Sequence, residues 1–170
     1  TLVEKPLAID TEAALRIANA FQKANLVGAV GHIERFNPAI RSMRQRIAEG
    51  ELGELYQIST RRIGPFPNRI RDVGVVKDLA THDLDLTVWV GNSQFKQISA
   101  HTAHKAGRSH EDLVAITGIL ESDLVTNHLV NWLSPLKERF TIATGEKGSF
   151  IADTLLADLT LHRNADAPPP

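Results

Sequence analysis

The sequence contains no cysteine among its 170 residues, which excludes disulfide bonds, thiolate catalysis and cysteine-ligated zinc sites. It also lacks an excess of one charge, because the formal net charge is −1 at pH 7 and the basic residues are spread along the chain. This composition predicts neither a nucleic-acid partner nor an anionic membrane partner. No apolar run reaches the roughly 18 residues of a membrane span, and no signal-peptide pattern opens the chain. These absences favour a cytoplasmic location.

The sequence does contain enough hydrophobic residues, 42% of the total, to form a core.

Both ends of the sequence are typical of a chain that has been truncated. Leu2-Val3 is typical of the end of a buried strand, and Ala167-Pro168-Pro169-Pro170 cannot join a sheet ladder and is typical of a loop or linker. The sequence therefore favours a fragment of a longer protein over a small domain with trimmed tags.

Residues 1–35 predict the end of an α/β domain. Asp10 is a good N-cap for a helix that runs to about Lys23, with Glu12 in its first turn. The apolar run Leu26–Gly31 predicts a strand covered on both faces, as in a parallel sheet. A helix followed by such a strand is half of a βαβ unit.

Residues 36–170 predict a second domain, incomplete at its C-terminus. Asn37-Pro38 starts a helix that ends near Gly50, a strand covers 55–63, and a second helix covers about 73–90. Strands then follow one another with short connections at 95–102, 112–120, 124–133, 138–144, 149–153 and 155–162. The predicted fold class is therefore α/β, with an α+β substrate domain: an open, mostly antiparallel sheet with helices on one face.

The helix at 73–90 carries the richest set of polar side chains. Asp78, His82, Asp85 and Trp89 are spaced three or four residues apart and share one stripe of a helix that is otherwise mainly apolar. An aspartate one turn from a histidine orients the imidazole and tunes a general base. The alternative is an ordinary ion pair on a wet face. A metal site is disfavoured because no second histidine follows at helical spacing, so no metal is expected.

A second candidate site is Glu4-Lys5-Pro6, which directly follows the apparent strand end at Leu2-Val3. Ligands of open α/β sheets bind at the carboxyl ends of the strands. Pro6 fixes its own φ angle and so holds Lys5 in a defined place. The alternative is a solvent-exposed lysine near a chain end.

Three segments in this order resemble the Gfo/Idh/MocA family of glucose-fructose oxidoreductases and inositol dehydrogenases. They are Glu4-Lys5-Pro6, then Gly31-His32-Ile33-Glu34-Arg35-Phe36-Asn37-Pro38, and then Gly74 with Asp78-x-x-x-His82-x-x-Asp85. The resemblance covers essentially the whole chain and is nearest to the branch of UDP-N-acetylglucosamine 3-dehydrogenases. It implies that residues 1–35 are the C-terminal remnant of a Rossmann domain and that the rest binds substrate.

The resemblance also implies an activity: hydride transfer from a sugar or nucleotide-sugar carbon to NAD or NADP. Lys5, Asp78 and His82 become the catalytic residues, and Glu4-Lys5-Pro6 the segment beside the cofactor. Substrate binding falls to Arg35, Asn37, Arg61, Arg62 and Asp85, with Arg61, Arg62 and Arg69 facing a diphosphate. The alternative is that these three arginines are ordinary surface residues of a strand. The open sheet is the expected surface of a homo-oligomer.

The sequence departs from the family in one large respect. The G-x-G-x-x-G turn that holds the cofactor diphosphate is not in this chain, so the chain alone is expected to be inactive. A non-catalytic sugar-binding or oligomerisation module is therefore the main alternative, and a metal-dependent hydrolase is a third.

Overall fold

The computed structural model describes residues 1–70 and 72–165, and the proline-rich linker predicted at 167–170 lies outside them. The chain divides into two compact units, Thr1–Ile33 and a second unit that begins at Glu34. The sequence placed a domain boundary after residue 35, and the assignment of the first part to a dinucleotide-binding domain stays a prediction. No helix within the described ranges is long and apolar enough to cross a membrane.

The first unit is a strand, a helix and a strand. Strands β1 (Leu2–Val3) and β2 (Ala29–Val30) pair in parallel, and α1 (Thr11–Lys23) connects them. The predicted N-cap is confirmed, because the Asp10 side chain accepts a hydrogen bond of 2.7 Å from the Ala13 N–H. The strand predicted over Leu26–Gly31 is shorter than expected, since only Ala29–Val30 pair with β1. Val27 is 85% exposed, because it lies in the connection from α1 and outside the two-residue strand.

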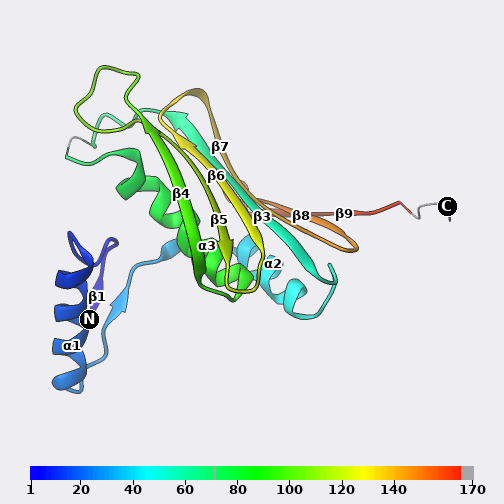
Figure 1. Ribbon diagram of the computed structural model, residues 1–170, viewed down its shortest axis with the longest axis horizontal. Coiled ribbons are helices and arrows are strands. Elements are labelled where there is room, and N and C mark those ends of the chain that lie inside the picture. Colours follow the sequence, from blue (N-terminus) through cyan, green and yellow to red (C-terminus); the bar gives the residue numbers. More distant parts are fainter. Residues whose placement is uncertain (71, 166–170) are drawn as a thin grey trace. The chain divides into compact units, whose positions relative to one another are not determined.

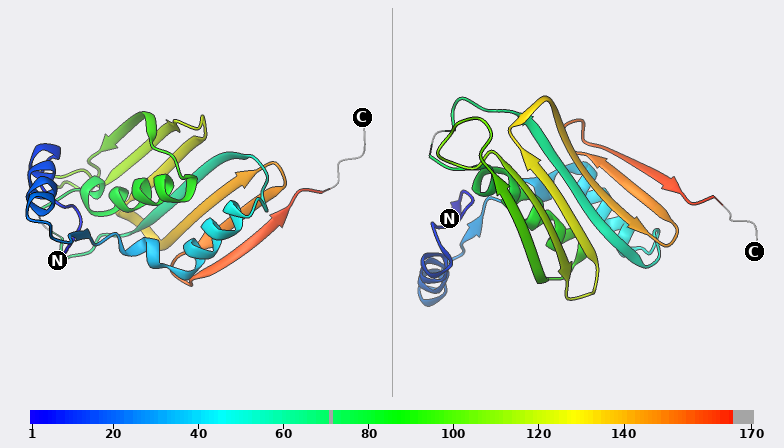
Figure 2. Two further views of the ribbon diagram at one scale, coloured as in Figure 1. Left: turned by 90° about the horizontal axis from the view of Figure 1, so that it is seen from below. Right: turned by 45° about the horizontal axis from the view of Figure 1, so that its top comes forward.

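The second unit is built on a seven-stranded sheet with the order β4-β5-β6-β3-β7-β8-β9. Every neighbouring pair is antiparallel except β3 and β6. Helices α2 (Pro38–Ala48) and α3 (Thr81–Gly91) cover one face, as Figures 1 and 2 show. The predicted open, mostly antiparallel sheet with helices on one face is thereby confirmed. Its strands are β3 (Leu55–Pro65), β4 (Phe95–Ala103), β5 (Leu113–Leu120), β6 (Val125–Asn131), β7 (Leu133–Gly145), β8 (Gly148–Asp153) and β9 (Asp158–Arg163).

The core lies between this sheet and the two helices. Alternate residues of β5 are buried on the helix side of the sheet, and the residues between them face the open side. One cluster joins α2 and α3 to β3 and β8, and its largest fully buried side chains are Ile40, Met43, Ile58, Leu86 and Phe150. A second cluster, around Val75, Val114, Val130 and Trp132, lies under the segment that leads into α3. This second cluster supports the segment that carries Asp78.

One histidine of the sheet is buried with the core. His128 on β6 lies opposite Thr60 of β3, and its Nδ1 is 2.9 Å from the threonine Oγ1. Burial lowers the pKa of the His128 imidazole from 6.5 to about 4. The folded protein therefore keeps this side chain neutral over a range of pH in which an unfolded chain protonates it.

We expect acid to destabilise the protein through His128. Between pH 6.5 and pH 4 only the unfolded chain takes up this proton, so the free energy of unfolding falls as the pH falls, by about 2 kcal/mol at pH 5 for this group. Urea unfolding at pH 7 and pH 5 measures the effect. His128→Gln should flatten the pH dependence, whereas His101→Gln, at an exposed position of β4, should leave it as it is. An equal dependence in both variants would contradict the assignment.

Candidate active site

The helix that carries Asp78 and His82 is not the single regular helix that the sequence predicts. A π-helix, η2 (Val76–Ala80), leads directly into α3. Its start is held from outside, because the Glu111 carboxylate accepts a 3.1 Å hydrogen bond from the Val76 N–H and the Glu111 carbonyl accepts one of 3.0 Å from Val75. Glu111 lies two residues before β5 and is far from η2 in sequence, so the local pattern at 73–90 cannot reveal this contact.

The structure keeps the two proposed catalytic side chains at the junction of η2 and α3. Asp78 lies in the π-helix and His82 in the first turn of α3, and both are half-buried. Inserted π-turns occur frequently at functional sites, where the wider turn re-aims side chains that a regular helix would fix. The catalytic roles of these two residues stay predictions.

The next acidic residue, Asp83, points away from this junction into a buried ion pair. Its Oδ1 accepts a 2.9 Å hydrogen bond from Nε of Arg62, and both side chains are almost fully buried. The Nη1 of Arg62 donates a second hydrogen bond, of 3.0 Å, to Oε1 of Glu34. Burial lowers the pKa of the Arg62 guanidinium, but attraction to Asp83 and Glu34 outweighs burial and leaves this pKa raised. Arg62 is thus held as a buried cation by two carboxylates.

The structure does not bring Arg61 and Arg62 together as partners of one diphosphate. Successive residues of a strand point to opposite faces, so Arg62 faces the helices and Arg61 faces the open side of the sheet. The Nε of Arg61 pairs there with Glu138 at 2.6 Å. Arg69 follows β3 and is exposed at the edge of a cavity on the helix side. Only Arg62 and Arg69 of the three arginines border that cavity.

The other predicted substrate residues have partners within the second unit. Arg35 forms a two-pronged ion pair with Asp85, in which its Nε donates to Oδ2 at 2.8 Å. The hydrogen bonds to Asp85 raise the pKa of the Arg35 guanidinium. Asn37 caps α2 as predicted, because its side chain accepts from the Ala39 N–H, and its Nδ2 also donates to the Thr154 carbonyl. A substrate role for these three residues stays a prediction.

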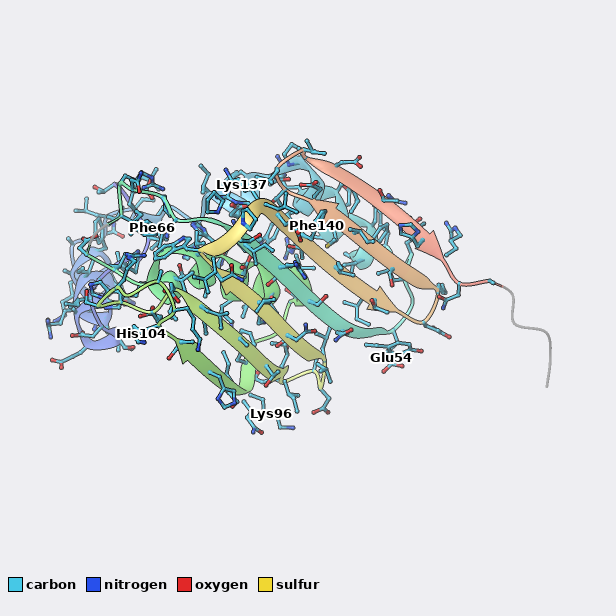
Figure 3. The ribbon with its side chains drawn as sticks, turned by 90° about the horizontal axis from the view of Figure 1, so that it is seen from above. Glu54, Phe66, Lys96, His104, Lys137 and Phe140 are labelled. Carbon is cyan, nitrogen blue, oxygen red and sulfur yellow. The ribbon has the colours of Figure 1, made fainter. Side chains whose placement is uncertain are left out.

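A cavity of about 330 Å³ opens beside Asp78, which is one of its lining residues. Four of its lining residues are basic, and two are aromatic. Figure 3 shows Phe66 and Lys137 at the same end of the sheet. The aromatic and basic lining residues Phe66, Trp132, Lys137 and Arg139 were not among the site residues predicted from the sequence. The sequence does show that Lys137 and Arg139 are two residues apart on one strand and therefore share a face of the sheet. Only the tertiary fold places that face beside η2.

The segment Glu4-Lys5-Pro6 directly follows β1 in the first unit. Gly31 directly follows the parallel strand β2, and its N–H donates a 2.7 Å hydrogen bond to the Val3 carbonyl. A Cβ on Gly31 would lie 3.3 Å from both Glu4 carboxylate oxygens, so glycine gives the carboxylate room. Because the carboxyl ends of parallel strands are where open α/β sheets bind dinucleotides, these residues fit a place beside a nicotinamide cofactor.

Residues 1–70 and 72–165 offer no support for the alternative of a metal site. No group of three or more histidine, aspartate or glutamate side chains within these ranges is arranged to hold a metal ion. The candidate site of the second unit therefore consists of Asp78, His82 and the basic cavity that Asp78 lines. The candidate residues of the first unit are Glu4 and Lys5.

The sequence matches a family model, the GFO/IDH/MocA C-terminal domain, over residues 40–151, which is more than half of the chain. A UDP-N-acetylglucosamine 3-dehydrogenase from Acidithiobacillus ferrooxidans is 41% identical over 87 residues, 51% of this chain and 26% of that protein. Inositol 2-dehydrogenase 2 from Saccharopolyspora erythraea is 28% identical over 113 residues, 65% of this chain and 33% of that protein.

Solved structures show the same fold. A UDP-N-acetylglucosamine 3-dehydrogenase from Acidithiobacillus ferrooxidans superposes with a TM-score of 0.85 at 28% identity, over 95% of this chain and 52% of that one. The WlbA dehydrogenase from Bordetella pertussis, solved with NADH and UDP-GlcNAcA, gives 0.86 at 21% identity, over 99% of this chain and 53% of that one. The chain thus spans about half the length of these proteins.

Proposed function

Because the chain belongs to the GFO/IDH/MocA family, we propose that it is the substrate-binding and catalytic part of an NAD(P)-dependent dehydrogenase of sugars or nucleotide sugars. The observation that carries the proposal is the junction of η2 and α3, where Asp78 and His82 are four residues apart and Asp78 borders a sugar-sized, basic cavity. Among the relatives, the UDP-N-acetylglucosamine 3-dehydrogenase supports a nucleotide sugar oxidised at C3. The alternative, a non-catalytic sugar-binding module, leaves Asp78 and His82 without a chemical role.

In the proposed mechanism, His82 removes the proton from the hydroxyl that is oxidised. A neutral imidazole is suited to this step because its ordinary pKa lies near neutrality. Lys5 hydrogen-bonds the same oxygen and stabilises the negative charge that develops on it, while Asp78 orients the pair and favours the protonated imidazole. Glu4-Lys5-Pro6 would hold a nicotinamide cofactor, which when bound would supply the acceptor for the hydride that leaves the same carbon.

The sequence contains no G-x-G-x-x-G turn and the chain covers about half of its solved relatives, so we propose the activity for a longer protein that contains the chain. NAD is the first cofactor to test, because the Bordetella pertussis structure contains NADH. We place the enzyme in the cytoplasm, where nicotinamide cofactors and nucleotide sugars are both available to it.

The direct test incubates the full-length protein with NAD and UDP-N-acetylglucosamine and follows the absorbance of the reduced nicotinamide. We expect absorbance to rise only when both compounds are present. The same assay with NADP, and with myo-inositol as the sugar, defines the cofactor and the substrate. No reduction with any of these combinations would contradict a dehydrogenase and favour the non-catalytic alternative.

We also propose that the open face of the sheet joins copies of the protein. This face carries large apolar side chains that are exposed in the single chain, namely Ile119 and Val125, which lie directly opposite each other on β5 and β6. Contiguous exposed apolar surface of this kind marks interaction sites. Size-exclusion chromatography with light scattering should give an oligomer, and Ile119→Asp should shift it towards the monomer. A strict monomer at all concentrations would contradict this part of the proposal.

A further inference from the structure

Two arginines face each other across β3 and β7. Arg62 and Arg139 are directly paired in the antiparallel register, and both border the cavity beside Asp78. Like charges directly opposite each other on a sheet destabilise it unless an anion separates them. Here Glu34 provides that anion, since its Oε1 is 3.0 Å from Nη1 of Arg62 and 3.5 Å from Nη1 of Arg139.

The Glu34 carboxylate lies closer to the Arg62 guanidinium than to the Arg139 guanidinium. Arg62 receives the closer contact and also has Asp83, so its charge is fully matched. Within residues 1–70 and 72–165, the longer contact to Glu34 is the only ion pair of Arg139, and the Arg139 side chain remains about one third exposed. Burial, and then repulsion from Arg62, lowers the pKa of the Arg139 guanidinium. The cation of Arg139 therefore lacks a dedicated carboxylate within this pair of strands.

Two further basic side chains border the same cavity. Lys137 is two residues from Arg139 on β7, and Arg69 lies after β3. Both are exposed, and within residues 1–70 and 72–165 neither makes an ion pair. Among the residues that the structure describes, Asp78 is the only acidic one that lines the cavity. The cavity thus has more positive than negative charge on its walls.

The aromatic wall of the cavity is held in place from behind. Phe66 and Trp132 pack edge to face, with ring centroids 5.3 Å apart, and the Arg108 guanidinium lies 3.6 Å from the Phe66 centroid. Arg108 belongs to the loop between β4 and β5, which Asp112 pins by accepting hydrogen bonds from the N–H groups of Lys105 and Ala106. An aromatic wall with a few charged groups, in about 330 Å³, is typical of a pocket for one small ring.

We propose that Arg139, assisted by Lys137, binds a phosphate or carboxylate group of the substrate in this cavity and thereby selects an anionic sugar over a neutral one. The inference rests on the proposed function and deepens it, because it assigns substrate selection to two residues of β7. A guanidinium accommodates either anion through paired N–H donors, so both are chemically equivalent at this stage. The aromatic wall meets the apolar face of the sugar ring, and the anion meets Arg139.

The experiment compares three small sugars that share one ring: glucose, glucuronate and glucose 1-phosphate. Their dissociation constants are measured by calorimetric titration of the protein, without cofactor and without turnover. We expect at least one anionic sugar to bind about tenfold or more tightly than glucose, since a hydrogen bond to a charged group contributes roughly 1.5–3 kcal/mol and 1.4 kcal/mol is a factor of ten. Whichever anion is preferred identifies the group that the substrate carries.

Arg139→Gln should remove this preference and leave glucose binding unchanged, and Arg139→Lys should retain part of it. Lys137→Gln should weaken anion binding only a few-fold, because an exposed lysine is screened by solvent. Arg163→Gln is the matched control, since Arg163 is exposed on β9 outside the cavity. Equal binding of all three sugars to wild type, no binding of any of them, or an unchanged preference in Arg139→Gln would overturn the proposal.

These outcomes are separate from those of the dehydrogenase assay. A protein that prefers the anionic sugar but never reduces NAD would contradict only the proposed function. A protein that reduces NAD with a neutral sugar and shows no preference would contradict only the role of Arg139.

Discussion

Replacing His82 with alanine is expected to lower the turnover of the full-length dehydrogenase by a factor of about 10²–10⁴, because general-base catalysis contributes about that much. The loss should appear in kcat and much less in KM, since His82 is proposed to act on a proton in transit. The assay follows reduced nicotinamide with UDP-N-acetylglucosamine as substrate. Raising the pH should recover part of the rate, because hydroxide in solution replaces the missing base.

His162→Ala is the control for this experiment. His162 is exposed on β9 and has the same side-chain chemistry, so its loss should leave turnover within a factor of two of wild type. A loss of only a few-fold in His82→Ala would show that another group removes the proton. Asp78→Asn then separates the roles, because a correctly placed but neutral partner should lower kcat while the fold is retained.

Replacing Arg62 with leucine is expected to destabilise the protein by about 3–5 kcal/mol, the usual cost of leaving a buried carboxylate without its cation. Asp83 is 1% exposed and receives its hydrogen bond from Arg62. Burial raises the pKa of the Asp83 carboxyl, and Arg62 opposes that rise. Without Arg62 this carboxyl should hold a proton more readily, so the loss of stability should be smaller at low pH. Urea unfolding at pH 5 and pH 8 measures both effects.

The adjacent arginine provides the matched control. Arg61 lies on the open face, is about half exposed and pairs with Glu138, so Arg61→Leu should change the free energy of unfolding by only about 0–1 kcal/mol. The double variant Arg62→Leu/Asp83→Leu should recover much of the loss, because it removes the orphaned carboxylate as well. Equal effects of Arg61→Leu and Arg62→Leu would contradict the buried ion pair. A retained fold in Arg62→Leu with lost sugar binding would favour the substrate role predicted from the sequence.

Local patterns predicted much of this fold. Asp10 and Asn37 cap the two helices that their positions indicate, and the alternation of β5 indicates its buried face. The spacing of Asp78 and His82 also placed both residues on one helical segment. Each of these patterns involves only residues within or next to the helix or strand that it predicts. A single sequence is therefore sufficient to recognise it.

Long-range contacts account for what the sequence could not predict. The π-helix depends on Glu111, and the role of Arg62 depends on Glu34 and Asp83. Arg61 and Arg62 are adjacent letters in the sequence, and only the alternation of a paired strand separates them onto opposite faces. Nothing in the sequence selects Arg139 as a site residue, because only the strand register places it opposite Arg62. The basic cavity is therefore a property of strand pairing and not of any motif.

The central position of β3 has a consequence for how the molecule folds. Its partners are β6 and β7, and the contact between Thr60 and His128 joins residues 68 positions apart. Such contacts close large loops, so a sheet with this topology is expected to fold slowly compared with a hairpin-only sheet. During synthesis β3 has no neighbour on either side until β6 and β7 have left the ribosome. Arg62 and Arg139 therefore meet only at a late stage, and the cavity forms together with the completed sheet.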